Sequence, residues 1–352
     1  MTSKEIDETT GASLALPNTF VLELTRHCNN RCGYCYNAWR APELQYAMDE
    51  QGEMTTAEIK WTILKLMEDL PLTTVVLSGG EPTLRPDLPE IVQFIRSQGL
   101  ATQIITNGTN LTESLVDATV SGCCYQISLL SWKREVHDRL TGHPGAWDAV
   151  IDGMTNVHLA GGHLIVVFVA TRQNYADIGP TAHIAMMLGA NSLMYNRINA
   201  GAANLHHSKE LFLTPTMVEE NLRVLDEIAA ATGFPVSTGV VIEPCMVDIA
   251  RYPHIQFNWC SLAGEQSTLI VDPAGNFRVC EHSSMVLGNI RRDSVRDIYE
   301  HHAYVKAFRT TWPTECTHCE NTLKESCRGG CKAAAEQAYG TFARVEPFVR
   351  LQ

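Results

Sequence analysis

Residues 28–35 read Cys28-Asn29-Asn30-Arg31-Cys32-Gly33-Tyr34-Cys35, and they directly follow the apolar, alternating run 20–25, which is typical of a buried strand. Three thiols on one short loop are a set of soft ligands and favour a metal centre. Structural zinc takes four protein ligands, whereas this loop offers three. The stretch therefore predicts a metal centre that keeps one coordination position open. A 4Fe–4S cluster held by three cysteines fits that donor count.

Three close cysteines are also compatible with a zinc half-site, or with a disulfide cluster in a secreted chain. Residues 1–17 are polar and acidic and contain no apolar segment of a secretion signal. The chain has 12 cysteines, and without a signal for export they indicate metal binding in a reducing compartment. We therefore expect a cytoplasmic protein.

The spacing C-x3-C-x2-C, with Tyr34 directly before the third cysteine, resembles the signature of the radical S-adenosylmethionine (SAM) superfamily. The resemblance implies that Cys28, Cys32 and Cys35 bind a 4Fe–4S cluster whose fourth iron binds SAM. It also implies reductive cleavage of SAM to a 5′-deoxyadenosyl radical, which abstracts a hydrogen atom from a substrate carbon. A flavodoxin- or ferredoxin-like protein is the expected electron donor.

Composition narrows the class of protein and its partners. The chain of 352 residues, 45% of them hydrophobic, is long enough for one large domain and a smaller one. No apolar run reaches the roughly 18 residues that a membrane span needs. The formal net charge of -12 repels phosphate backbones and anionic membrane surfaces. We therefore expect neither nucleic acid nor membrane as a partner.

Short apolar, β-branched runs alternate with segments of helical periodicity from residue 20 to about residue 198. The predicted strands are 20–25, 74–78, 102–106, 125–130, 164–170 and 192–197. The predicted helices are 56–70, 88–99, 111–121, 146–161 and 176–188, and a further helix is predicted at 215–232. This α/β series predicts a parallel sheet wound by right-handed crossovers. Six units give a partial (β/α)6 TIM-like barrel, the fold that the radical SAM resemblance also implies.

The loops after the predicted strands carry candidate binding residues, because parallel βα folds place their chemistry at the carboxyl ends of the strands. The stretch Gly79-Gly80-Glu81-Pro82 combines two glycines that allow close backbone approach with a carboxylate that can pair with an ammonium group. It resembles the GGEP motif of the family, which holds the amino group of SAM. Asn107 and Ser128 resemble positions that line the SAM site, although each residue type also has common local roles.

Two further pairs of polar residues follow predicted strands. His137 and Asp138 could act as an acid–base pair, but such residues more often cap the next helix and hold a loop, which is the interpretation we favour. Arg197 and Asn199 are candidates to face the substrate, because they end the sixth predicted strand.

The last third of the chain holds seven of the cysteines, namely Cys245, Cys260, Cys280, Cys316, Cys319, Cys327 and Cys331. Two strands at 268–271 and 277–279 around a turn at 272–276 predict a hairpin that brings Cys260 and Cys280 close together. The spacing C-x14-G-x4-C followed by C-x2-C-x7-C-x3-C resembles the SPASM domain of radical SAM enzymes. We therefore predict an N-terminal tail at 1–18, the barrel at 19–235 and a SPASM/Twitch-like domain at 236–352.

The resemblance implies two auxiliary iron–sulfur clusters, most simply 4Fe–4S. The first set of ligands is Cys260, Cys280 and Cys331, with Cys245 as the candidate fourth. The second set is Cys316, Cys319 and Cys327. Val349 replaces the last cysteine of the family, so the fourth position of the second cluster falls to Glu346, water, substrate or nothing. A single auxiliary cluster, and a role for Cys245 as hydrogen-atom donor, stay open.

The SPASM resemblance implies maturation of a ribosomally synthesised peptide by cross-linking or oxidation, with an auxiliary cluster accepting an electron. The first predicted strand begins at residue 20, so we expect any leader-peptide-binding domain to be a separate protein. One alternative is a radical dehydrogenase or epimerase of a small molecule such as an aminosugar. Another is a non-enzymatic zinc-binding interaction module.

Overall fold

The computed structural model describes residues 16–37, 52–201, 204–260 and 268–350. Most of the predicted N-terminal tail, residues 1–15, lies outside this part. The strands are β1 (Thr19–Glu23), β2 (Thr74–Ser78), β3 (Ala101–Thr106), β4 (Cys123–Ser128), β5 (His163–Ala170), β6 (Ser192–Arg197), β7 (Val236–Thr238), β8 (Ile255–Gln256), β9 (Thr268–Val271), β10 (Asn276–Arg278) and β11 (Gly288–Asn289). The helices are α1 (Thr56–Asp69), α2 (Leu88–Ser97), α3 (Glu113–Thr119), α4 (Arg134–Thr141), α5 (Ala146–Leu159), α6 (Ile178–Met187), α7 (Ser208–Leu211), α8 (Pro215–Thr232), α9 (Val295–His301), α10 (Ala303–Thr310), α11 (Lys324–Cys327) and α12 (Lys332–Tyr339).

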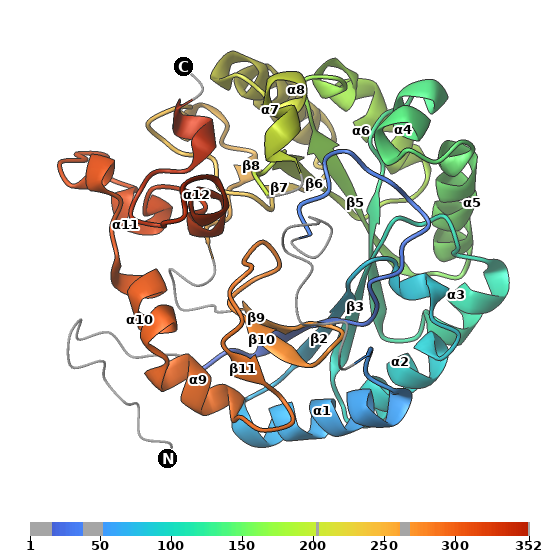
Figure 1. Cartoon of the computed structure of the whole chain (residues 1–352). Coiled ribbons are helices and arrows are strands. Elements are labelled where there is room, and N and C mark those ends of the chain that lie inside the picture. Colours follow the sequence, from blue (N-terminus) through green and yellow to red (C-terminus); the bar gives the residue numbers. More distant parts are fainter. Residues whose placement is uncertain (1–15, 38–51, 202–203, 261–267, 351–352) are drawn as a thin grey trace.

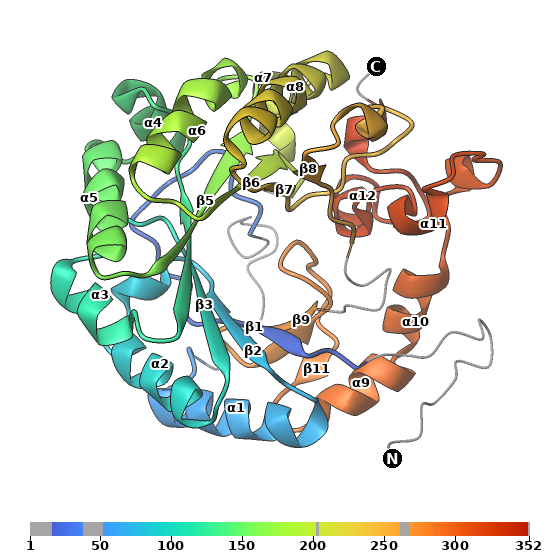
Figure 2. The same cartoon turned by 180° about the vertical axis from the view of Figure 1, so that it is seen from behind.

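All of these strands belong to one sheet of 11 strands in the order β11-β10-β9-β1-β2-β3-β4-β5-β6-β7-β8. Strands β1 to β8 run parallel to their neighbours. Figures 1 and 2 show the helices α1, α2, α3 and α5 on the outer side of the curved sheet, with α9 to α12 beside its open side. The predicted partial barrel is therefore confirmed, and β7 and β8 extend it beyond six strands.

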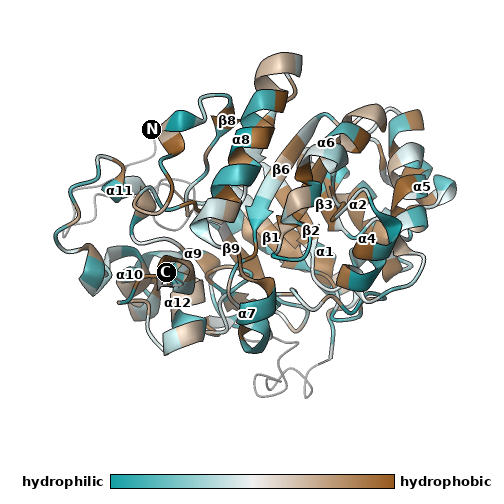
Figure 3. Cartoon of the chain, turned by 90° about the horizontal axis from the view of Figure 1, so that it is seen from above, coloured by the Kyte–Doolittle hydropathy of each residue, from teal (hydrophilic) through white to brown (hydrophobic). Residues whose placement is uncertain are grey.

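Alternation along the strands supplies two apolar layers, because successive strand residues face opposite sides of a sheet. Val75 and Leu77 of β2 pack in the main core with Ile59 and Ile63 of α1. Val76 between them faces the other side, in a small cluster of buried valine and isoleucine side chains. Figure 3 shows the hydrophobic residues along the inner strands, and α8 banded with hydrophilic and hydrophobic residues.

The predicted elements match the structure best where the pattern is long and regular. The predicted ranges 74–78, 192–197, 215–232 and 268–271 coincide with β2, β6, α8 and β9. The prediction missed the strands β7, β8 and β11 and the helices α4, α7 and α9 to α12. Strands β7 and β8 are three and two residues long, which is too short for an alternating pattern. No helix among the described residues is long and apolar enough to cross a membrane.

The C-terminal region joins the barrel through the sheet itself. Strand β9 pairs in parallel with β1, with Thr19 opposite Thr268 and Leu22 opposite Val271. The predicted hairpin is present, since β10 pairs antiparallel with β9. The Asp272 carboxylate closes its turn by accepting hydrogen bonds from the backbone N–H groups of residues 274 and 276, each at 2.9 Å. The strand that leads into the three-cysteine loop is therefore held on both sides.

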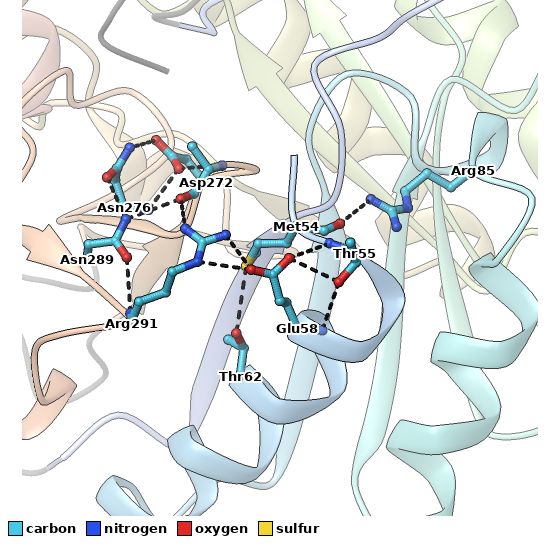
Figure 4. Close-up of polar contacts among 10 residues, drawn as sticks. Met54, Thr55, Glu58, Thr62, Arg85, Asp272, Asn276, Asn289 and Arg291 are labelled. Atoms are coloured by element: carbon cyan, nitrogen blue, oxygen red, sulfur yellow. Dashed lines mark hydrogen bonds and ion pairs between the residues drawn. The ribbon is translucent and has the colours of Figure 1, made fainter. Parts of the chain in front are cut away.

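Side-chain contacts reinforce this junction at the start of α1 (Figure 4). Thr55 and Glu58 form a capping box, in which each side chain accepts a hydrogen bond from the backbone N–H of the other residue. The second Glu58 oxygen accepts from Arg291 Nε at 3.0 Å and Nη2 at 2.8 Å. Met54 N donates to Pro273 O at 2.7 Å. One glutamate thus both caps the first barrel helix and binds the C-terminal region to it.

A buried ion pair ties the end of β1 to β10. Glu23 and Arg278 are in contact, and their side chains are 1% and 2% exposed. Arg278 Nη1 also donates to Ser283 O at 2.8 Å. Burial raises the pKa of Glu23 to about 7, and the Arg278 charge opposes that rise. Each charge therefore depends on the other for its stabilisation in the interior.

We predict that Arg278→Ala lowers the free energy of unfolding by about 3–5 kcal/mol, because it leaves a buried carboxylate without its partner. The matched control is Arg223→Ala, which removes an exposed i,i+4 pair with Glu227 and should cost less than about 1 kcal/mol. Urea unfolding followed by circular dichroism measures both variants. Equal losses in the two variants would contradict the importance of the buried pair.

Candidate active site

One pocket at the carboxyl ends of β1 to β4 collects nearly all of the predicted SAM-site residues. Its lining includes Cys28, Cys32, Tyr34, Cys35, Gly79, Gly80, Glu81, Asn107 and Ser128. Pro82 lies just outside this lining, where it begins the short 3-10 helix η3 (Pro82–Leu84) and is buried. The structure therefore brings together residues from four separate strand ends around the three thiols.

Two glycines allow the turn after β2 to lie directly against the three-cysteine loop. Gly80 N donates to Thr25 O at 2.7 Å, and Glu81 N donates to His27 O at 2.8 Å. A Cβ atom on Gly80 would lie 2.2 Å from His27 O, and Gly79 has a φ of +124°. Any side chain at these positions would push the two segments apart. The two glycines therefore allow the backbone of this turn to contact the backbone of the three-cysteine loop directly.

The Glu81 carboxylate accepts four hydrogen bonds from within the protein. Its Oε1 atom accepts from Thr83 N at 3.1 Å, from Thr83 Oγ1 at 2.6 Å and from Thr106 Oγ1 at 2.6 Å. Its Oε2 atom accepts from Asn107 N at 2.8 Å. Glu81 is 1% exposed, and burial raises its pKa. The sequence analysis expects this carboxylate to pair with the SAM ammonium; in the structure it holds the end of β3 and also lines the pocket with the three thiols.

Asn107 connects the end of β3 to the three-cysteine loop. Its Nδ2 atom donates to Asn29 Oδ1 at 2.8 Å and lies 4.0 Å from Cys28 Sγ. Its Oδ1 atom accepts from Thr109 N at 2.9 Å. Within the loop, Asn30 N donates to Cys28 Sγ at 3.4 Å. Two N–H groups, one from the loop itself and one from the end of β3, therefore face the sulfur of Cys28.

The structure confirms the structural interpretation of His137 and Asp138. His137 is buried, and its Nδ1 atom accepts from Leu130 N at 3.2 Å. Asp138 accepts from Gly145 N at 2.7 Å and from Trp147 N at 2.8 Å, at the start of α5. Both residues thus hold the connection after β4.

A second pocket gathers four cysteines of the C-terminal region. It is lined by Cys245, Cys316, Cys319 and Cys327, together with apolar side chains such as Trp312 and Val349. Burial raises the pKa of Cys316 to about 11 and that of Cys327 to about 12, and neighbouring cysteines add to both shifts. Thiols in this situation lose their protons readily only to a metal.

The remaining three cysteines form a separate group. Cys280 and Cys260 are close enough for their charges to interact, and Cys331 interacts with both. All three pack against the main core. Burial raises the pKa of Cys280 to about 12, and the neighbouring Cys260 adds to that rise. This grouping differs from the sequence-based one, because Cys245 lies with the four-cysteine pocket instead.

Two residues that the sequence analysis missed connect the SAM pocket to Cys280. His282 stacks on Tyr36 of the pocket lining, with ring centroids 4.0 Å apart. Tyr36 Oη donates to Glu281 Oε2 at 3.2 Å. Glu281 Oε1 and His282 Nε2 are buried and have no hydrogen-bond partner among the described residues. Their position directly after Cys280 was the available signal.

Arg197, a candidate to face the substrate, is instead buried at the end of β6. Its Nη2 atom lies 3.2 Å from Glu243 Oε1 and 2.5 Å from Glu346 Oε1. Glu346 Oε1 also accepts from Cys331 N at 2.7 Å. A Cβ atom on Gly330, which has a φ of +84°, would lie 2.0 Å from Glu243 Oε1. We name Arg197, Glu243 and Glu346 the buried charge cluster.

The donor chemistry fits iron–sulfur clusters. Each group consists of cysteine sulfurs, the ligands that such clusters take. Among the described residues, no three histidine, cysteine or acidic side chains converge at distances suited to a single metal ion. A 4Fe–4S cluster needs no such convergence, because each of its thiolates binds a different iron atom.

Comparison with known proteins gives the family. Residues 22–185 match the radical SAM superfamily, and residues 260–331 match an iron–sulfur cluster-binding domain, SPASM. The chain is 28% identical to a PqqA peptide cyclase of Methylocella silvestris, covering 95% of this chain and 88% of that protein. It is 25% identical to an AdoMet-dependent heme synthase of Methanosarcina barkeri, covering 94% and 96%. It is 26% identical to the mycofactocin maturase MftC of Mycobacterium tuberculosis, covering 91% and 80%.

The solved structures agree on the fold. Streptococcus suis SuiB bound to its precursor peptide SuiA superposes with a TM-score of 0.74 at 16% identity, covering 96% of this chain and 76% of that one. The structure of anSMEcpe with AdoMet and a peptide gives 0.72 at 15% identity, covering 95% and 94%. The chain belongs to the radical SAM superfamily. More particularly, it is a radical SAM enzyme with a C-terminal SPASM domain that binds auxiliary iron–sulfur clusters.

We predict that Glu81→Gln lowers the free energy of unfolding by about 1–3 kcal/mol. The NH2 group of the glutamine would replace one carboxylate oxygen, and the N–H or O–H groups that donate to that oxygen would lose their acceptor. Chemical unfolding and SAM titration are measured on the same sample, with exposed Glu90→Gln as the control. Unchanged stability together with lost SAM affinity would show instead that the carboxylate binds the SAM ammonium directly.

Proposed function

We propose that this enzyme matures a ribosomally synthesised peptide, by cross-linking or by oxidising a side chain. The observation that carries this proposal is the contact between the SAM pocket and the Cys280 group through Tyr36 and His282. An oxidation needs an acceptor for the electron left on the substrate, and this contact places a second cysteine group beside the first. The relatives named as a PqqA peptide cyclase and a mycofactocin maturase support this proposal.

In this proposal Cys28, Cys32 and Cys35 hold the 4Fe–4S cluster, and the remaining pocket lining holds SAM. When bound and reduced, the cluster supplies the electron that cleaves SAM to a 5′-deoxyadenosyl radical, the species that abstracts hydrogen from the substrate. Asn107 keeps Cys28 in place through the loop. Glu81 already accepts four hydrogen bonds, so the backbone of the turn 79–82 is proposed as a further partner of the SAM ammonium.

The residues of the second and third cysteine groups are assigned as ligands of two auxiliary clusters. One group, Cys260, Cys280 and Cys331, lies on the side of the SAM pocket, where a bound cluster would supply an electron acceptor. A flavodoxin- or ferredoxin-like donor and a separate leader-peptide-binding protein complete the proposal, with the cytoplasm as its compartment.

Glu281 is proposed to contact the substrate. Its Oε1 atom is buried and unpartnered among the described residues, and its Oε2 atom accepts from Tyr36, a residue of the pocket lining. An unpaired buried acceptor is costly, so a substrate N–H or O–H group that donates to it would be bound favourably. A peptide offers such groups along its backbone.

A small-molecule substrate is the second candidate. It is favoured by the heme synthase relative, whose similarity extends over 94% of this chain. Incubation with candidate peptides and with porphyrins, followed by mass spectrometry for loss of hydrogen, separates the two. Product from the porphyrin alone would overturn the peptide proposal.

We predict that the anaerobically purified protein is brown and converts SAM to 5′-deoxyadenosine when reduced with dithionite. Cys32→Ala should abolish this conversion, because it removes one of the three thiolates that hold the SAM-binding cluster. Iron content should fall by about four atoms per chain. The control is Cys124→Ala, a half-buried thiol on β4 outside all three groups. Full activity of Cys32→Ala would refute the assignment.

We predict that Glu281→Gln slows product formation by about 10- to 100-fold, the loss expected for a hydrogen bond to a charged group. Uncoupled SAM cleavage without substrate should persist, since Glu281 does not line the described SAM pocket. The two rates are measured in parallel by chromatography of 5′-deoxyadenosine and of modified substrate. Equal loss of both rates would show that the residue supports the SAM site instead.

A further inference from the structure

The four-cysteine pocket contains the position at which this chain lacks a cysteine of the SPASM pattern. Val349 stands where the SPASM pattern has its last cysteine, and it lines the same pocket as Cys316, Cys319 and Cys327. Cys245 lines this pocket as well, although it lies some 70 residues earlier in the chain and outside the matched SPASM range. The pocket therefore has four thiols despite the missing one.

The turn that carries Cys245 is held firmly. Met246 N and Val247 N both donate to Glu243 O, at 2.9 and 3.1 Å. The Glu243 side chain in turn belongs to the buried charge cluster through Arg197. Cys245 thus projects from a turn that is fixed at its backbone and anchored by a buried ion pair.

Residues on the opposite wall of the pocket bring the chain close to two of its cysteines. Residues 328, 329 and 330 have φ values of 50°, 83° and 84°, in the left-handed region that favours glycine. Gly330 N donates to Cys327 O at 2.9 Å, which closes the turn after α11. A Cβ atom on Gly329 would lie 3.3 Å from Cys316 Sγ and 2.3 Å from the Pro313 ring.

The other candidates for the fourth position are less well placed. Glu346 is not part of the described lining of this pocket; its Oε1 atom accepts from Arg197 and from Cys331 N, and its Oε2 atom is buried without a hydrogen-bond partner among the described residues. Glu243 lines the pocket, but its oxygens pair with Arg197. Cys245 lies in a different pocket from Cys28, Cys32 and Cys35, which argues against direct hydrogen transfer to a substrate radical at the SAM site.

We infer that Cys245 is the fourth ligand of the auxiliary cluster bound by Cys316, Cys319 and Cys327, and that it replaces the missing cysteine at position 349. The inference deepens the proposed function and rests on it for the identity of the cluster as iron–sulfur. It assigns one auxiliary cluster four thiolates. The other cluster then has the three thiolates of Cys260, Cys280 and Cys331 among the described residues.

The test compares three proteins purified anaerobically: the wild type, Cys245→Ser, and the double variant Cys245→Ser with Val349→Cys. Iron and sulfide are counted per chain, Mössbauer and EPR spectra are recorded, and iodoacetamide labelling of each cysteine is followed by mass spectrometry. Cys124→Ser, which removes a half-buried thiol from β4, is the matched control.

The wild type should contain about 12 irons per chain, about four for each of three clusters. Cys245→Ser should lose about one to four of these irons and the spectrum of one cluster, and the double variant should regain them, because its new thiol faces the same pocket. Cys245 should resist labelling until the iron is removed with a chelator. Cys124→Ser should keep the wild-type iron content.

Four results would overturn the inference. The first is that Cys245→Ser keeps the iron content and spectrum of the wild type, and the second is that Cys245 is labelled at equal rates with and without iron. The third is an iron loss that the Val349→Cys change does not restore, and the fourth is zinc in place of iron at this pocket. A wild type that loads iron and protects Cys245 but does not cleave SAM would refute the proposed function and leave this inference standing.

Discussion

The buried charge cluster is the interaction on which the arrangement of both C-terminal cysteine groups depends. A guanidinium and two carboxylates in the interior are stable only while they stay together, since removing one partner leaves an uncompensated charge. Arg197 ends the last long barrel strand, Glu243 precedes the Cys245 turn, and Glu346 binds the backbone at Cys331. Burial raises the pKa of Glu243 well above its usual range, Arg197 opposes that rise, and the neighbouring Glu346 adds to it. Barrel, turn and C-terminal segment are thereby fixed to one point.

The sequence was sufficient to predict the fold wherever local pattern and tertiary structure agree. Strands β2, β6 and β9 and helix α8 have the predicted bounds, because alternation, helical periodicity and turn residues point to the same elements there. Strands β7 and β8 carry no such pattern, and their pairing is decided by neighbours that are distant in the sequence. Helix α4 is short and polar, and its packing against α5 could not be predicted from its own residues.

The candidate site was predictable as a set of residues, but not in its detailed roles. Short motifs identified the pocket lining, because strand ends in a parallel fold converge. The hydrogen bonds to the Glu81 carboxylate were not predictable, because two of the donors, Thr106 and Asn107, come from the end of the next strand. The partners of Cys245 depend on the path of the chain between the barrel and the C-terminus, which spacing does not reveal. Glu281 and His282 became candidates only when their unpaired buried atoms were known.

The parallel pairing of β9 with β1 has a consequence for how the chain can be divided. A protein ended after the barrel would lose the neighbour of β1 and present a bare row of unsatisfied backbone groups beside Phe20 and Leu22, which are otherwise fully buried. Exposed apolar edge strands of this kind pair with strands of other molecules. A shortened SAM-cleaving fragment would therefore tend to aggregate, and the two regions have to be made, and to melt, as a single cooperative body.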